Sequence, residues 1–207
     1  GAIAEKLSDF CGASNIHTNS RITAIFHDNE RIKAVEVNGD RIRTDEVLST
    51  LPLNVFLQLM KPLPSAEISA MANRLSFRSL ILVTLLLKQE SVTQGVSVHF
   101  PALELPFTRI HEPKKRSEYM APLGETSLVV EIPCQQGDEF WNLEDQKLIQ
   151  MVVSKLTAIH WIRHERVIDG VVVRLNHAYP VLDIGYEHRT QSIFRYLAGF
   201  DNLKLTG

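Results

Sequence analysis

Hydrophobic and polar residues change their spacing along the chain, and these changes divide it into predicted elements. Residues 2–10 repeat apolar side chains at helical intervals, and Gly12 ends the helix that they predict. Residues 20–49 alternate instead, with turn sequences at HDNE and at an Asn-Gly pair, so they predict a β-meander. The last strand of this stretch runs to Pro52, which cannot continue a hydrogen-bonded ladder.

The remainder of the chain mixes helical and strand patterns. An apolar run at residues 80–87, interrupted by Thr84, predicts a central strand that is buried on both faces. Ser65 is placed to cap a helix. Other spacings predict helices at 53–60, 65–75, 143–160 and 189–200, and strands at 96–100, 107–111, 127–132, 166–181 and 202–206. The whole pattern predicts an α+β fold whose middle is a mixed sheet with flanking helices.

Composition and charge are those of an ordinary globular protein. Hydrophobic residues make up 44% and charged residues 22% of the 207 positions, and the net charge is −2. This balance gives no broad positive field, so neither nucleic acid nor an anionic membrane is an expected partner. The longest apolar run is too short to cross a bilayer, which takes about 20 residues, so no transmembrane segment is expected. Cys11 and Cys134 are distant and unpatterned, which favours two buried thiols and a cytoplasmic location.

Most motifs that carry chemistry are missing from the sequence. It contains no G-x-G-x-x-G or P-loop to hold phosphates and no G-x-S-x-G nucleophile elbow. His160 and His164 have the spacing of a helical metal pair, but no glutamate follows His160 as it does in zincins. Solvated histidines are therefore favoured, and no metal site is expected. The acidic residues of the middle are scattered, and nothing pairs two of them as acid and base: Glu104, Glu112, Glu131 and Asp138. The catalytic residues stay unassigned.

Four polar residues beside apolar strands are candidates for binding a substrate. Arg78 comes just before the apolar run. Arg109 and His111 lie in FTRIHEP, and Tyr179 lies in HAYPV. A guanidinium next to a buried strand needs a carboxylate, carbonyl groups or a ligand anion. For each residue alone an internal salt bridge is the favoured explanation, and a substrate contact is the alternative.

Several stretches, taken in order, resemble one superfamily of flavoproteins. Residues 1–25, GAIAEKLSDFCGASNIHTNSRITAI, look like the helix and strand on the adenine side of FAD in that superfamily. DEVLSTLPL is similar to its strand that ends in a Ser/Thr-x-Pro turn, and LSFRSLILVTLLL resembles the first long strand of its substrate domain. NLKLTG looks like the strand that leads to its second flavin-contacting glycine motif. The superfamily comprises FAD-dependent amine oxidases, protoporphyrinogen oxidases and phytoene desaturases, with UDP-galactopyranose mutase as a relative.

The resemblance implies that the chain is an internal fragment of a longer flavoprotein. Residues 1–51 would belong to its FAD-binding, Rossmann-like domain, residues 52–198 would form the substrate-binding domain, and residues 199–207 would return to the FAD domain. The first fifty residues and the last strand should then lie side by side, and the strand at 80–87 should be the most buried of the middle. Four residues would contact the cofactor: Arg21, Ile22, Thr50 and Leu51.

The function implied by the resemblance is hydride transfer from a small-molecule substrate to FAD in the full-length protein. FAD is not expected to stay bound to the fragment, because the glycines and the helix N-terminus that hold its pyrophosphate are missing from the sequence. Two alternatives stay open, a flavin-dependent sugar-nucleotide mutase and a non-enzymatic binding module. The apolar face that residues 1–50 would expose also predicts a homodimer.

Overall fold

The computed structural model describes residues 2–206, so Gly1 and Gly207, the outermost residues of the predicted domains, lie outside the described residues. The chain divides into two compact units. The first unit contains residues 1–75 and 182–207, and the second unit contains residues 76–181.

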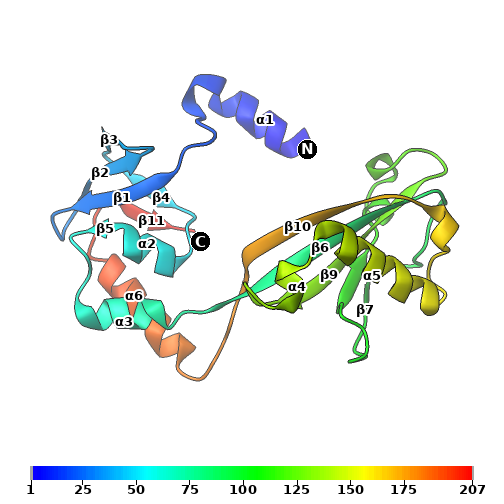
Figure 1. The fold of residues 1–207 in the computed structure, drawn as a ribbon. Coiled ribbons are helices and arrows are strands. Elements are labelled where there is room, and N and C mark those ends of the chain that lie inside the picture. Colours follow the sequence, from blue (N-terminus) through cyan, green and yellow to red (C-terminus); the bar gives the residue numbers. More distant parts are fainter. Residues whose placement is uncertain (1, 207) are drawn as a thin grey trace. The chain divides into compact units, whose positions relative to one another are not determined.

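The first unit combines a small mixed sheet, a two-stranded sheet and several helices (Figure 1). Its helices and strands are α1 (Ala2–Cys11), β1 (Ile22–His27), β2 (Ile32–Val37), β3 (Asp40–Arg43), β4 (Val47–Ser49), α2 (Leu53–Leu59), β5 (Met60–Lys61), α3 (Ala66–Asn73), α6 (Tyr186–Leu197) and β11 (Leu203–Leu205). The strand order of the mixed sheet is β3-β2-β1-β5, antiparallel except for the parallel pair β1–β5. In the two-stranded sheet β4 runs parallel to β11, which confirms that the strand before Pro52 and the last strand are neighbours.

Local sequence signals explain the ends of several elements in this unit. Asn38 and Gly39 both have positive φ, 52° and 95°, as the predicted tight hairpin between β2 and β3 requires. Ser65 caps α3 as predicted, because its hydroxyl accepts a hydrogen bond from the main-chain N–H of Ile68. The core residues come from β1, β2, α2 and β5 and are almost fully buried: Ile25, Ile32, Phe56, Leu57 and Met60.

The second unit is a five-stranded sheet with helices on one face (Figure 1). Its helices and strands are β6 (Phe77–Leu87), β7 (Ser97–His99), β8 (Arg109–His111), β9 (Thr126–Cys134), α4 (Glu139–Asn142), α5 (Asp145–Ala158) and β10 (Val167–Pro180). The strand order is β10-β6-β9-β8-β7, and every neighbouring pair is antiparallel. The α+β class and the presence of a mixed sheet are confirmed, but the mixed sheet belongs to the first unit and not to the middle of the chain.

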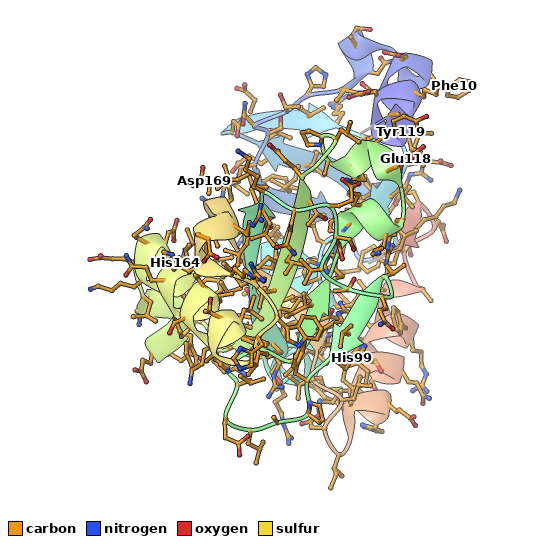
Figure 2. The ribbon with its side chains drawn as sticks, turned by 90° about the vertical axis from the view of Figure 1, so that its right-hand side faces the viewer. Phe10, His99, Glu118, Tyr119, His164 and Asp169 are labelled. Atoms are coloured by element: carbon orange, nitrogen blue, oxygen red, sulfur yellow. The ribbon has the colours of Figure 1, made fainter. Side chains whose placement is uncertain are left out.

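Helix α5 covers one face of the five-stranded sheet, and Figure 2 shows it on one side of the strands. Alternate residues of the strands point into this core, and β6 contributes Ile81, Val83, Leu85 and Leu87. Gly170 of β10 lets the helix approach closely, since a Cβ atom at this position would lie 2.9 Å from the side chain of Ile149. The other face of the sheet carries no such cover within the second unit, and we call it the open face.

Two expectations for the strand at residues 80–87 need correction. The strand is not buried on both faces, because Leu86 is exposed and its even-numbered neighbours Leu82 and Thr84 are half-buried. Nor is it the most buried strand, since β9 in the centre of the sheet is buried at a larger share of its positions. An antiparallel sheet can expose one face, and the apolar run is explained by an open face that is itself apolar.

The compact units do not coincide with the domain boundaries expected at residues 51/52 and 198/199. Helices α2 and α3 pack with β1 and with α6, so they belong to the first unit. Cys134 is buried as expected, but Cys11 is exposed, because no residue of α1 is buried.

The described residues contain neither a membrane-crossing helix nor a metal centre. No helix within residues 2–206 is both long and apolar enough to span a bilayer. Among the same residues no group of His, Cys, Asp or Glu side chains is arranged to hold a metal ion.

Candidate functional site

The open face of the five-stranded sheet presents an apolar surface. Val171, Val173 and Leu175 of β10 are 52%, 46% and 39% exposed, and Leu86 of the neighbouring β6 is 37% exposed. These positions alternate with less exposed ones along each strand, and the strand register places their side chains on one face. Contiguous exposed apolar surfaces of this kind often mark binding sites.

A polar network lies on the same face and joins three of the four predicted residues. The guanidinium of Arg109 donates through Nη2 to Oε1 of Glu131, at 2.5 Å, and to the hydroxyl of Tyr179, at 3.3 Å. Nδ1 of His111 lies 3.6 Å from the same oxygen of Glu131. We call Arg109, His111, Glu131 and Tyr179 the polar cluster.

Strand register brings the polar cluster together. Arg109 of β8 lies directly opposite Glu131 of β9, which places both side chains on one face. His111 is two residues beyond Arg109 and therefore shares its face. Tyr179 follows an irregularity in the pairing of β10 with β6, and its long side chain reaches Arg109 across the sheet. His99 of the edge strand β7 is opposite Arg109 on the other side, and Figure 2 shows it away from α5.

The electrostatics of the polar cluster keep its ion pair charged and its histidine neutral. The hydrogen bond that Arg109 donates to Glu131 is the main cause that raises the pKa of the Arg109 guanidinium. Burial is the main cause that lowers the pKa of His111, with Arg109 and Arg116 acting in the same direction and Glu131 opposing them. At neutral pH the cluster therefore offers a neutral imidazole beside the ion pair of Arg109 and Glu131.

Arg78 has a different environment from Arg109. It is exposed, it lies opposite Tyr179 in the strand register, and no ion pair of Arg78 occurs within residues 2–206. The internal salt bridge favoured from the sequence is therefore wrong for Arg78 and correct for Arg109.

We expect Arg78→Ala to change the free energy of unfolding by no more than about 0.5 kcal/mol, because an exposed side chain without a partner contributes little. Arg109→Ala is the matched comparison, and it should cost about 2 kcal/mol, since it leaves the buried carboxylate of Glu131 without its donor. Urea denaturation of both variants measures the difference. Equal losses would contradict the assignment of the two arginines.

Three of the four predicted cofactor residues line one groove in the first unit. Ile22 of β1 and Thr50 and Leu51 after β4 border a hollow of about 390 Å³, whose apolar wall includes Ile25, Val35 and Phe56. Arg21 lies just outside it. Both main-chain groups of Arg21 are bonded to Asn38, its N–H to the side-chain oxygen at 2.9 Å and its carbonyl to the N–H at 3.0 Å. The main-chain N–H of Arg21 is therefore occupied, so a hydrogen bond that Arg21 donates to a ligand would come from its exposed side chain.

Sequence reasoning missed the role of Glu131. It was one of several scattered acidic residues, and no spacing along the chain connects it with Arg109 or Tyr179. The partners come from three different strands, so only the register of the sheet identifies them. One signal in the sequence could have identified Glu131: it lies within an apolar strand, where a buried carboxylate needs a hydrogen-bond donor.

Comparison with known protein families assigns the chain to one of them. The sequence matches the family described as flavin containing amine oxidoreductase over residues 1–188. No curated protein sequence matches the chain.

Several solved structures share the fold, among them the following three. Reduced UDP-galactopyranose mutase has a TM-score of 0.83 and 19% identity, covering 99% of this chain and 44% of that chain. A protein assigned as a protoporphyrinogen oxidase, from Exiguobacterium sp. 255-15, has a TM-score of 0.76 and 22% identity. The match covers 100% of this chain and 45% of that chain. Putrescine oxidase bound to putrescine has a TM-score of 0.68 and 14% identity, covering 99% and 45%. The chain thus spans less than half the length of the proteins whose fold it shares.

Proposed function

Because the chain belongs to the family of flavin-containing amine oxidoreductases, we propose that the whole protein is an FAD-dependent oxidoreductase. The observation that carries the proposal is the family match over residues 1–188. In this proposal the second unit binds a small-molecule substrate, and the first unit holds part of the cofactor.

The groove beside Ile22, Thr50 and Leu51 fits one end of FAD. Its volume of about 390 Å³ is at the lower end of small-molecule sites, and its walls are mostly apolar, as a flat aromatic ring prefers. The sequence contains no glycine-rich pyrophosphate loop, so we predict that the 207-residue chain alone does not retain FAD. When bound, FAD would supply the chemistry of hydride acceptance from the substrate.

The open face would orient the substrate. Val171, Val173 and Leu175 provide an apolar floor, which excludes water from a substrate lying against it. The hydroxyl of Tyr179 and the imidazole of His111 provide hydrogen bonds beside this floor. Glu131 keeps Arg109 in place, so the charged pair fixes the position of Tyr179. Arg78, exposed next to Tyr179, is a further substrate contact in this proposal.

A sugar-nucleotide mutase is the second candidate function, favoured by the similarity of the fold to reduced UDP-galactopyranose mutase. Such a reaction would need cationic groups for a diphosphate. The charge of Arg109 is already compensated by Glu131. Of the two predicted arginines, Arg78 is therefore the one available to bind a diphosphate. The oxidoreductase proposal does not need these charges, and we prefer it.

Two further predictions belong to the proposal. The apolar side chains of α1 are exposed, Ile3 by 80%, Leu7 by 59% and Phe10 by 90%, which supports self-association through this helix as a homodimer. Figure 2 shows Phe10 projecting from α1. A cytoplasmic location also stays a prediction.

Anaerobic reduction of the purified full-length protein tests the proposal. We expect a yellow protein with one FAD per chain, whose oxidised flavin absorbance is bleached by one class in a panel of primary, secondary and tertiary amines. Conversion of a UDP-sugar to its ring isomer by the prereduced protein, without net flavin oxidation, would favour the mutase instead. A colourless protein that takes up no added FAD would contradict both candidates.

A further inference from the structure

A cationic hollow on the first unit lies next to the groove proposed for FAD, and Thr44 lines both. Four basic side chains surround it, and it has a volume of about 630 Å³: Arg31, Lys33, Arg41 and Arg43. One carboxylate, that of Asp45, also lines it. All four cations come from the β2–β3 hairpin and the turn before it, so they form one contiguous surface. We call these four residues the basic hollow.

Two of the guanidinium groups are held in place by neighbours that do not neutralise them. The guanidinium carbon of Arg41 lies 3.8 Å from the centre of the Phe26 ring, a cation–π geometry that leaves its N–H groups available. Arg31 donates through Nη2 to the main-chain oxygen of Asp45 at 2.8 Å, which fixes its plane and uses one of five donors. Ala34, which lies directly opposite Arg43 in the strand pairing, also lines the hollow, and its small side chain leaves space between the arginines.

The charges of the basic hollow are only partly compensated. Lys33 is paired with Asp28 at 2.7 Å, and hydrogen bonds from Lys33 and from the main chain of Arg31 lower the pKa of Asp28 to about 2. Asp45 offsets a second positive charge. Within residues 2–206 neither Arg41 nor Arg43 forms an ion pair, although Glu36 lies opposite Arg41 in the strand register. The four cations therefore exceed the nearby carboxylates of Asp28, Glu36 and Asp45 by one charge.

We propose that the basic hollow binds a soluble small molecule that carries a diphosphate or a longer polyphosphate group. Planar guanidinium groups bind phosphate oxygens in pairs, and two fixed arginines facing one hollow match two linked phosphates better than a single anion. The volume lies within the range of small-molecule sites. The alternative explanation for cations on β3, protection of an edge strand, does not account for the stacking of Arg41 on Phe26 or for the concave shape.

Isothermal titration of the full-length protein with inorganic pyrophosphate at constant ionic strength tests the proposal. We expect saturable binding to the wild-type protein and at least about tenfold weaker binding to the Arg41→Gln/Arg43→Gln variant. The flavin absorbance of both proteins should stay unchanged, which separates this site from the cofactor. Arg43→Gln alone should show part of the loss, and it keeps the stacked Arg41 if the double variant folds poorly.

The matched control is Lys115→Gln/Arg116→Gln, which removes two exposed positive charges from the second unit. It should bind pyrophosphate like the wild type. Equal weakening in the control would show a general charge effect and would overturn the proposal. So would absence of pyrophosphate binding combined with sedimentation on phosphatidylserine vesicles that the arginine variant loses, since that result assigns the hollow to a membrane surface.

Discussion

Replacing Glu112 by alanine should lower the free energy of unfolding by about 3–5 kcal/mol, since each buried donor left without an acceptor costs about 1–3 kcal/mol. The carboxylate is completely buried, directly after β8. Its oxygens accept hydrogen bonds from the main-chain N–H groups of Val92 and Thr93, at 3.1 Å and 2.7 Å, and from the hydroxyls of Thr93 and Thr126, each at 2.7 Å. The loop before β7 is thus attached to β8 and β9 through one side chain. Alanine would leave these buried donors without an acceptor, which is why the loss should be large.

Glu118→Ala is the matched control for Glu112→Ala. Glu118 lies in the loop between β8 and β9, it is exposed, and Figure 2 shows it at the surface. Its removal should change stability by less than about 0.5 kcal/mol. Hydrogen exchange gives a local measurement, since the amides of Val92 and Thr93 should lose protection in Glu112→Ala and keep it in Glu118→Ala. Unchanged protection in Glu112→Ala would contradict the described network.

The same carboxylate should make stability depend on acid pH. Burial by itself would raise the pKa of Glu112, but the hydrogen bonds from Thr93, Thr126 and Val92 outweigh it and lower the pKa. A group whose pKa is lower in the folded state stabilises the fold above its unfolded pKa, about 4.3, and the contribution disappears as pH falls through the folded pKa. Glu112→Gln should remove this part of the pH dependence.

Asn202→Ala should destabilise the first unit by about 2–4 kcal/mol. The buried amide of Asn202 accepts a hydrogen bond from the N–H of Ile32 at 2.9 Å. It also donates to the carbonyl oxygens of Ile32 and Asp45, at 2.9 Å and 2.8 Å. One side chain therefore joins β2 to the segments that lead into β4 and β11. Its loss would leave buried main-chain groups of Ile32 without partners.

Two comparisons sharpen the Asn202 prediction. Asn202→Asp keeps the shape but places a carboxylate against two carbonyl oxygens, so its loss of stability should equal or exceed that of alanine. Asn73→Ala should be nearly neutral, because the side chain of this exposed residue makes a single described contact, with Gln58. A urea denaturation series measures all three. An aspartate variant as stable as the wild type would show that the amide does not donate as described.

Local signals in the sequence predicted the elements well, because short-range physics determines them. The Asn38-Gly39 turn and the Ser65 cap need only their own neighbours, and the structure has both. The apolar run at 80–87 was placed correctly in the second unit's sheet. Its burial was overestimated, because an apolar strand in a parallel sheet and one in a half-exposed antiparallel sheet have the same sequence pattern.

The candidate site depended on contacts that no local pattern contains. The sequence marks Arg109, His111 and Tyr179 only as separate polar residues beside apolar strands. In the structure Glu131 joins Arg109 to His111, and Arg109 in turn bonds Tyr179. Nor could the sequence predict that Arg78 forms no ion pair with another residue of the described range 2–206. Arg78 has no such partner because its side chain is exposed. Its position before an apolar run does not indicate that exposure.

The central claim is that the open face of the second unit receives the substrate while the first unit holds part of the flavin. Rapid-mixing measurement of anaerobic flavin reduction in full-length Val173→Arg tests it most directly, using the amine that reduces the wild-type protein fastest. Val173 lies halfway along the edge strand β10, on the open face, and is 46% exposed, so arginine can be accommodated without loss of the core. Gln150→Arg, on the exposed surface of α5, is the matched control. We predict that both variants bind FAD like the wild type, and that reduction slows at least about a hundredfold in Val173→Arg alone, since a charge would displace the substrate from its apolar floor. Reduction of Val173→Arg at the wild-type rate would contradict the claim.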